Sequence, residues 1–191
     1  MKVLEIILFL STAAATQQAG RNAVDAFRAM APAVIRSTFP QANSVAATQA
    51  ATPQVFKHVD AGIEFELPAG WTAKPDGDVL TIATPDSSVQ VVLWAIESLT
   101  GDDALKSLRP TLDQTIKNQK ITKPAKKYIL NEMPVITESG TGEVDGTTIE
   151  WTVDLITAKK PIIFLIFAAP QFVDKHADEV AKFRRSIKKL T

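Results

Sequence analysis

The stretch PIIFLIFAAP, from Pro161 to Pro170, decides the fold, because no other run outside the first ten residues is as apolar. It is shorter than the roughly 20 residues that a membrane-spanning helix needs. A strand with one face in water would alternate apolar and polar residues, and this run does not. We therefore expect a strand at the centre of a sheet, covered on both faces, with a turn before Pro161 and a helix beginning at Pro170.

Strand and turn patterns surround this run. Alternating or continuous apolar residues predict further strands, and tight turns separate most of them, among which Asp145-Gly146 is the clearest hairpin signal. The sheet should therefore be antiparallel. The predicted strands are VFKHV (55–59), GIEFELP (62–68), VLTIAT (79–84), VQVVLWAI (89–96), KKYILNEMPV (126–135), ITESGTGEV (136–144) and TTIEWTVDLITA (147–158).

Two segments have helical periodicity instead. Residues 100–119 place Leu105, Leu108, Leu112 and Ile116 on one face, with Pro110 either kinking the helix or starting a second one. Residues 170–190 carry a second apolar stripe, made of Val173, Ala177, Val180, Phe183, Ile187 and Leu190. If both helices covered one face, the continuous apolar strands would be exposed on the other. The prediction is an α+β fold, an antiparallel β-sheet with helices on both faces, in other words an α/β/α sandwich.

Composition excludes several functions. The chain has 191 residues, no cysteine, and equal numbers of basic and acidic residues, 21 of each. The absence of cysteine removes disulfides, thiolate catalysis, cysteine-ligated metals and a lipoprotein anchor. Residues 55–191 carry 17 basic and 19 acidic residues, so no strong positive field draws in nucleic acid, and we expect no nucleic-acid partner.

The N-terminal segment resembles an export signal. Lys2, the apolar run from Val3 to Leu10 and the small residues Ala13-Ala14-Ala15 match a secretory signal peptide, assigned to residues 1–19. Glu5 interrupts the apolar run, and an N-terminal helix of the folded protein is the alternative. With export, the protein is extracytoplasmic, either periplasmic or secreted.

Residues 20–54 form an Ala/Gln/Thr-rich flexible segment in this interpretation. Within it, residues 21–39 also resemble a transit peptide or a short interfacial helix, so peripheral membrane association through the N-terminal segment stays open. Whether the segment is cleaved or retained as an anchor also stays open. The folded domain is expected over residues 55–191.

The order of elements is similar to that of the PsbP-like and DcrB-like superfamily, which shares its fold with the Ran-binding Mog-type import factor. The resemblance rests on GIEFELPAGWTAKPDGDVLTIATPD, on the paired strands around Asp145-Gly146, and on the closing FRRSIKKL, and it covers about residues 55–191. It implies an accessory, assembly or binding module without a shared catalytic set. No catalytic or cofactor-binding residue is therefore carried over, and no cofactor is expected.

Few residues in the sequence are candidates for catalysis or metal binding. The chain has two histidines, and a metal site could form if His58 and Asp60 met His176, although the simpler interpretation is two surface histidines. Ser139 and Ser87-Ser88 lie beside turns but outside any nucleophile motif. The acids Glu64, Glu66, Asp76, Asp78 and Asp86 are either paired acids for glycosidic chemistry or a solvated strand face and turn-forming aspartates. The segment FRRSIKK is either a patch for anionic lipid or a complement to the helix dipole.

The sequence therefore predicts a non-enzymatic exported accessory or binding module that acts through protein–protein contacts with a partner it does not identify. A small-ligand or lipid-binding carrier with a cleft between sheet and helix is the alternative. A metal-dependent or hydrolytic enzyme is the weaker one. The oligomeric state is not predicted.

Overall fold

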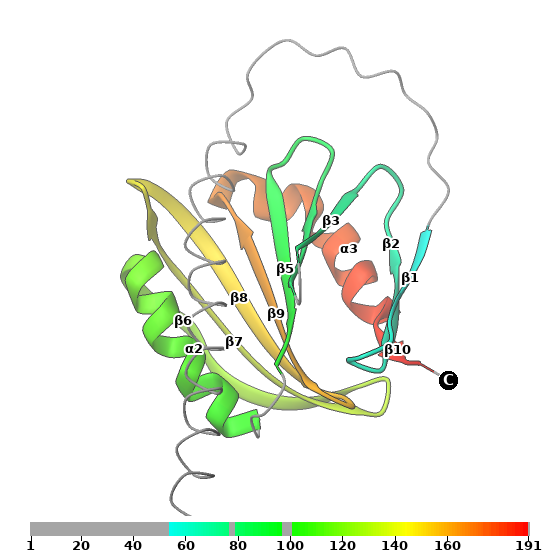
Figure 1. Ribbon diagram of the computed structural model, residues 1–191. Coiled ribbons are helices and arrows are strands. Elements are labelled where there is room, and N and C mark those ends of the chain that lie inside the picture. The colour runs from blue at the N-terminus through cyan, green and yellow to red at the C-terminus, as the bar shows by residue number, and fades with distance from the viewer. Residues whose placement is uncertain (1–53, 77–78, 97–100, 191) are drawn as a thin grey trace, which may run out of the picture.

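The computed structural model describes residues 54–76, 79–96 and 101–190 (Figure 1). The predicted signal peptide and nearly all of the flexible segment lie outside these residues. The described strands are β1 (Gln54–His58), β2 (Ile63–Leu67), β3 (Thr72–Asp76), β4 (Val79–Ala83), β5 (Val89–Ala95), β6 (Lys117–Leu130), β7 (Met133–Val144), β8 (Thr147–Thr157), β9 (Pro161–Ala168) and β10 (Lys188–Lys189), and the described helices are α2 (Gly101–Thr115) and α3 (Pro170–Ser186).

The main sheet has seven strands in the order β3-β4-β5-β9-β8-β7-β6, and every neighbouring pair is antiparallel. The antiparallel prediction is confirmed. Strand β9 is the fourth of the seven, and all of its residues after Pro161 are buried. The run that decided the fold therefore lies at the centre of the sheet, as its apolar sequence predicted.

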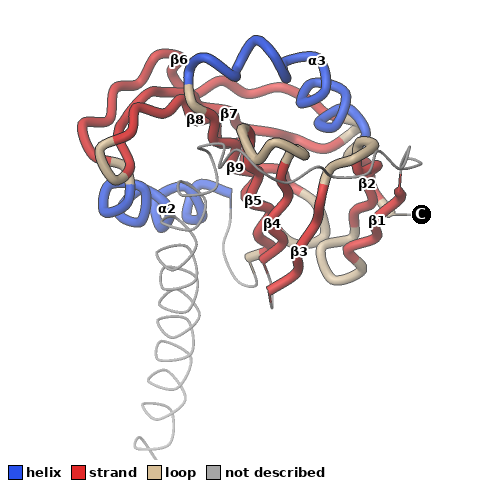
Figure 2. The backbone as a smooth tube through the Cα atoms, turned by 90° about the horizontal axis from the view of Figure 1, so that it is seen from above, coloured by secondary structure: helices blue, strands red, loops and turns tan. Residues whose placement is uncertain are grey.

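Strand β9 divides its side chains between two hydrophobic clusters. Ile162, Phe164 and Ile166 belong to a cluster with Phe183 of α3, whereas Ile163 and Leu165 belong to a second cluster. That second cluster contains the α2 residues Ala104, Leu108 and Leu112. Seen from above, α3 and α2 lie on opposite sides of the curved sheet (Figure 2). The two sides are called the α3 side and the α2 side below.

A second, three-stranded sheet, in the order β1-β2-β10, was not expected. It adds Ile63 and Phe65 to the α3-side cluster, where Phe65 meets Phe183 at a ring-centroid distance of 5.5 Å. Strand β10 is also a correction, because residues 170–190 were expected to be entirely helical. The helix ends at Ser186, and an extended Ile187 is buried before Lys188 pairs with Glu64 of β2.

The predicted first helix also ends early. Helix α2 runs through Pro110 without a second start and ends at Thr115, whereas the prediction extended it to residue 119. Strand β6 begins at Lys117 and continues for 14 residues, where only its last five were predicted as a strand. Strand β3, which was not among the predicted strands, pairs with β4. The Asp145-Gly146 turn has positive φ at both residues, as predicted for this hairpin.

Candidate functional site

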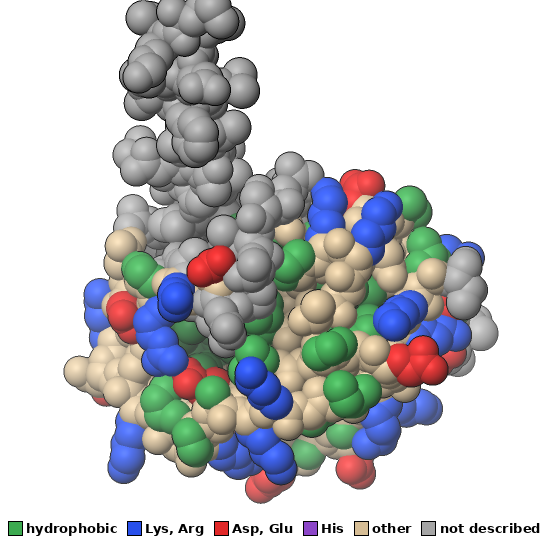
Figure 3. All heavy atoms as spheres, turned by 90° about the horizontal axis from the view of Figure 1, so that it is seen from below, with side chains coloured by type: hydrophobic (Ala, Val, Ile, Leu, Met, Phe, Trp, Pro, Cys, Tyr) green, Lys and Arg blue, Asp and Glu red, His purple; other side chains and the backbone are tan. Residues whose placement is uncertain are grey.

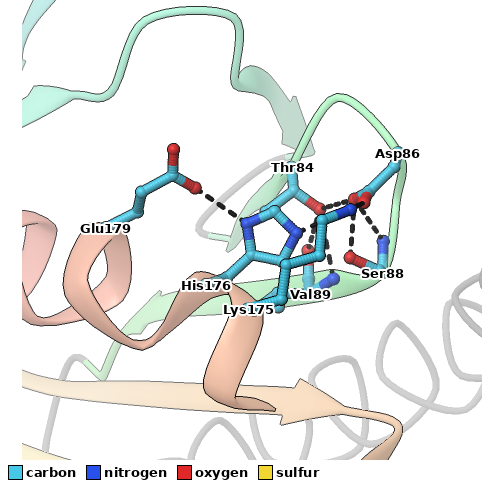
Figure 4. A network of polar contacts seen from close by, with 7 residues as sticks. All are labelled: Thr84, Asp86, Ser88, Val89, Lys175, His176 and Glu179. Atoms are coloured by element: carbon cyan, nitrogen blue, oxygen red, sulfur yellow. Dashed lines mark hydrogen bonds and ion pairs between the residues drawn. The ribbon is translucent and has the colours of Figure 1, made fainter. Parts of the chain in front are cut away.

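His176 is the buried polar centre of one candidate site. Its imidazole, on α3, lies between two carboxylates: Nε2 is 3.2 Å from Asp86 Oδ2, and Nδ1 is 2.8 Å from Glu179 Oε2 (Figure 4). The residue is only 7% exposed, which corrects the expectation of a surface histidine. Asp86 comes from the turn between β4 and β5, so the network fastens this turn to α3.

Asp86 holds the turn together. Its carboxylate accepts hydrogen bonds from the Thr84 and Ser88 hydroxyls, at 2.7 and 2.6 Å, and it pairs with the Lys175 ammonium. Partial burial acts to raise the pKa of Asp86, but the hydrogen bonds from Lys175, Ser88 and Thr84 outweigh it and hold this pKa well below its usual range. The carboxylate is therefore charged at any neutral or mildly acidic pH.

The candidate metal ligands do not gather. His58 ends β1, and its Nδ1 accepts a hydrogen bond from the Ala61 backbone N–H at 3.3 Å, within its own turn. Asp60 is exposed in the same turn. Across the described ranges, no group of three His, Cys, Asp or Glu side chains could hold a metal ion. Around His176 the two carboxylates lie on opposite sides of the ring, so they do not converge on one point.

The other candidate catalytic residues form hydrogen bonds or ion pairs within the fold. The Ser139 hydroxyl lies 2.9 Å from that of Thr152, and Ser88 bonds to Asp86. Glu64 pairs with Lys188 at 3.0 Å. Ser139 and Glu64 gain neither a base nor a second carboxylate from these contacts, and the Asp86 carboxylate beside Ser88 has a lowered pKa, which makes it a poor base.

A buried ion pair lies on the α3 side. Arg184 reaches Asp154 of β8 at 2.6 Å and donates a second hydrogen bond to the Tyr128 hydroxyl at 3.0 Å. Burial raises the pKa of Asp154, with Arg184 opposing, and burial likewise raises the pKa of Tyr128. Because Arg184 bonds to both Asp154 and Tyr128, we assign this pair to packing between α3 and the sheet.

Three hollows among the described residues could hold a small ligand. A groove of about 130 Å³ runs between α3 and β8, lined by Glu150, Thr152, Val180 and Arg184 among others. A larger cleft of about 320 Å³ lies between the two sheets, with Phe56, Phe65 and Leu80 in its lining and His58 and Asp60 among its polar residues. A third hollow, of about 610 Å³, is lined mostly by charged and polar side chains, namely Glu66, Asn131, Glu132, Lys182, Arg185, Ser186, Lys188 and Lys189. Ligand pockets measure about 300–1,000 Å³, so the second and the third are of ordinary size, and the second is the one with an apolar lining.

The feature that sequence reasoning missed is strand β6. It is one of the two edge strands of the main sheet and carries five exposed lysines, Lys117, Lys120, Lys123, Lys126 and Lys127, with no acidic residue between positions 117 and 131. Among the described residues, no ion pair is formed by any of the five. The signal in the sequence was this run of charge of one sign, which the near-zero balance of the whole domain concealed.

Three register shifts bring four of these lysines to one face. They lie between Lys117 and Lys120, between Ile121 and Lys123, and between Lys123 and Lys126, and each adds one residue to β6 relative to β7. As a result, the first four lysines pair with alternate residues of β7, namely Glu143, Thr141, Ser139 and Thr137. Residues directly opposite each other in a sheet project to the same face. The spacing of three in the sequence thus becomes a single row.

This row lies on the α3 side of the sheet. Thr137 pairs with Asp154, which bonds to Arg184 of α3, so the odd-numbered residues of β7 face that side. Lys127 pairs with Ile136, which packs against the α2-side cluster, and therefore faces the other way. Asn118 has a φ of 50° at the first shift, a conformation that asparagine tolerates better than most residues.

Beside the lysines lies a polar stretch of sheet. The paired rows Thr137, Ser139, Thr141 on β7 and Thr152, Glu150 on β8 are half-buried, and the groove beside α3 begins at Thr152 and Glu150. We call the surface formed by Lys117, Lys120, Lys123 and Lys126 with these two rows the lysine face. Elsewhere, hydrophobic side chains are scattered between charged ones on the described surface visible in Figure 3.

Within the described residues, none of the helices has the length and apolar character needed to span a membrane.

Comparisons with known proteins reveal similarity of structure only. No protein-family model and no curated protein sequence matches the chain. The solution structure of cyanobacterial PsbP (CyanoP) from Synechocystis sp. PCC 6803 matches with a TM-score of 0.55 and 16% identity, over 78% of this chain and 99% of that one.

Two further structures match less closely. PA94 from Pseudomonas aeruginosa, a protein of unknown function, has a TM-score of 0.46 and 10% identity, over 70% of this chain and 94% of its own. LpqN of Mycobacterium tuberculosis, involved in cell envelope biogenesis, has a TM-score of 0.49 and 12% identity, over 72% and 90%. The match to CyanoP shows that this domain has the PsbP-like fold that the resemblance predicted.

Proposed function

We propose that the protein is a non-enzymatic, exported accessory module that acts through protein–protein contacts, and that the lysine face is its contact surface. One observation carries the proposal: four lysines that form no ion pair with any described residue stand in a row on an exposed edge of the main sheet, beside a polar part of the sheet. The fold on which this rests is the α/β/α sandwich, supported by the division of β9 between two clusters.

Lysines on an edge strand also have a simpler role, since they discourage strands of other molecules from pairing there. Register shifts and Pro124, which lacks a backbone N–H, serve the same end. That role requires charge at the edge but not on one particular face. Bringing four of five lysines to the same face is the additional feature that favours binding.

The enzymatic alternatives receive less support. His176, Ser139 and Glu64 each have a partner that fixes structure rather than assembling a reactive group. The Ala13-Ala14-Ala15 pattern supports export, and an unprocessed Met1 in a cytoplasmic fraction would contradict that part of the proposal.

A small-ligand carrier remains a second candidate because of the 320 Å³ cleft, although the cleft lies between the two sheets rather than between sheet and helix. Leu80→Trp would fill it. If that variant keeps its stability but loses an apolar fluorescent probe such as anilinonaphthalene sulfonate, the carrier function is favoured. If wild-type protein binds no such probe, this candidate is wrong.

The binding proposal is tested by quantitative cross-linking of the full chain in the cell that produces it. The test variant has four charge reversals, Lys117→Glu, Lys120→Glu, Lys123→Glu and Lys126→Glu. The matched control has four reversals at exposed lysines elsewhere, Lys74→Glu, Lys106→Glu, Lys127→Glu and Lys182→Glu. The proposal predicts that cross-linked partners disappear in the first variant and persist in the control. Equal partner yields from the two variants, both folded, would contradict it.

A further inference from the structure

We infer that the lysine face binds an extended, acidic segment of a partner protein, whose carboxylates occupy alternate positions along its chain. This inference rests on the proposed function and names the chemistry of the partner. It is carried by the spacing of the four lysines, by the polar rows beside them, and by features of β6 that oppose simple strand addition.

The spacing fits an extended peptide. The four lysines lie opposite residues 143, 141, 139 and 137 of β7, which are two residues apart. Alternate residues of a strand are separated by about 7 Å, so the row extends for about 20 Å. In an extended peptide, side chains at positions i, i+2, i+4 and i+6 also point to one face at this interval. A segment with acids at those four positions can therefore match each lysine with one carboxylate.

The polar rows provide the second part of the argument. Next to the lysines, β7 offers the hydroxyl row Thr137, Ser139 and Thr141, all half-buried. Two of these hydroxyls have partners inside the sheet, since Thr137 bonds to Asp154 and Ser139 contacts Thr152. A hydroxyl remains an acceptor when it donates, and a donor when it accepts, so the row can still bond a peptide lying across it.

The edge itself favours contact through side chains over backbone pairing. Three register shifts and Pro124 interrupt the outer hydrogen-bonding groups of β6, which makes a continuous added strand unfavourable. The segment is therefore placed beside β6, over β7, with its acids directed to the lysines. Glu143 and Glu150 lie at the far end of the same surface, so the segment should carry its acids opposite Lys120, Lys123 and Lys126 and tolerate a neutral residue near Lys117.

The test is fluorescence anisotropy of labelled octapeptides titrated with the full chain. The alternating peptide Glu-Thr repeated four times is compared with a block peptide of four Glu followed by four Thr, which has the same charge. In an extended block peptide, only half of the acids face the lysines. Each exposed ion pair changes affinity about two- to fivefold, so the alternating peptide should bind about fivefold more tightly than the block peptide.

Neighbouring lysines on opposite faces supply the sharpest control. Lys126→Glu should weaken binding of the alternating peptide about fivefold or more, whereas Lys127→Glu, one residue away on the α2 side, should change it less than about twofold. Raising the salt from 50 to 500 mM should also weaken binding, since these charges are exposed.

The outcomes separate the inference from the function on which it rests. Equal binding of the two peptides, or equal effects of the two substitutions, would overturn the inference. So would tighter binding to phosphatidylglycerol vesicles or to single-stranded oligodeoxythymidine, each sensitive to Lys126→Glu, because the face would then recognise a membrane or a nucleic acid. If no peptide binds but the fourfold reversal still removes the cross-linked partner, the inference fails while the proposed function stands. If the fourfold reversal leaves the partner in place, the proposed function fails as well.

Discussion

Replacing Arg184 with alanine should strongly destabilise the protein. The Asp154 carboxylate is almost completely buried, at 1% exposure, and Arg184 is the cation that pairs with it, at 2.6 Å. Removing one partner of a buried pair typically costs about 3–5 kcal/mol, because the other charge stays buried without compensation. The Arg184 side chain is 28% exposed, so water can enter the space that it leaves. We therefore expect a loss near the lower end, about 3 kcal/mol.

The assay is equilibrium unfolding in urea, followed by tryptophan fluorescence. Arg185→Ala is the matched control, since the neighbouring Arg185 is exposed and should change the free energy of unfolding by less than about 0.5 kcal/mol. A double variant with Arg184→Met and Asp154→Leu removes both charges. It should recover most of the lost stability, because no charge is then left buried.

The stability loss of Arg184→Ala should depend on pH. Burial raises the pKa of Asp154, and Arg184 opposes the rise, so the pKa should rise further in Arg184→Ala. A carboxyl whose pKa is higher in the folded state favours folding at low pH, and this contribution is lost as pH rises through the folded pKa. The deficit of Arg184→Ala should therefore be smaller at pH 5 than at pH 8. A deficit below about 1 kcal/mol at pH 7, or one that is the same at both pH values, would refute the reasoning.

Two further predictions concern other parts of the domain. Gly140→Ala should lower the free energy of unfolding in urea by about 1–3 kcal/mol, because the added methyl would meet the Trp151 ring at 2.5 Å and the Lys120 carbonyl oxygen at 2.7 Å. A variant as stable as wild type would show that this packing is loose. Asp86→Asn should cost about 1 kcal/mol at pH 7, a discounted value because the carboxylate is partly exposed. Folding lowers the pKa of Asp86, so the stability that its carboxylate contributes is lost as pH falls from about 4 through the folded pKa. The free energies of unfolding of wild type and variant should therefore converge in acid. A constant difference between them down to pH 2 would contradict this.

Much of the central sheet could be predicted from sequence because it depends on local apolar pattern. The run from Pro161 to Ala168 had no polar position that could face water, and Asp145-Gly146 supplied both residues of a tight turn. The strands that were not predicted are those whose own sequence does not indicate the strand with which they pair. Strand β3 contains Pro75 between polar residues, and Lys188 of β10 forms a strand only because Glu64 lies opposite.

The candidate site was less predictable. His176 could be named as chemically interesting, but its neighbour Asp86 is 90 residues away in sequence, and only the packing of α3 brings them together. The lysines of β6 are evident in the sequence, but most of them are three residues apart. In a regular strand, whose side chains alternate between the two faces, residues three apart point to opposite faces. Only the register shifts against β7 show that four of them share one face.

The most direct test of the central claim is a nuclear magnetic resonance titration of lysine side-chain signals with the alternating Glu-Thr peptide. Lys117, Lys120, Lys123 and Lys126 pair with alternate residues of β7, and Lys127 pairs with the opposite set. We predict that the signals of Lys120, Lys123 and Lys126 shift most, with Lys117 less, while Lys127 and the distant Lys74 stay in place. Shifts at Lys127 as large as those at Lys126, or shifts spread evenly over all exposed lysines, would contradict the account.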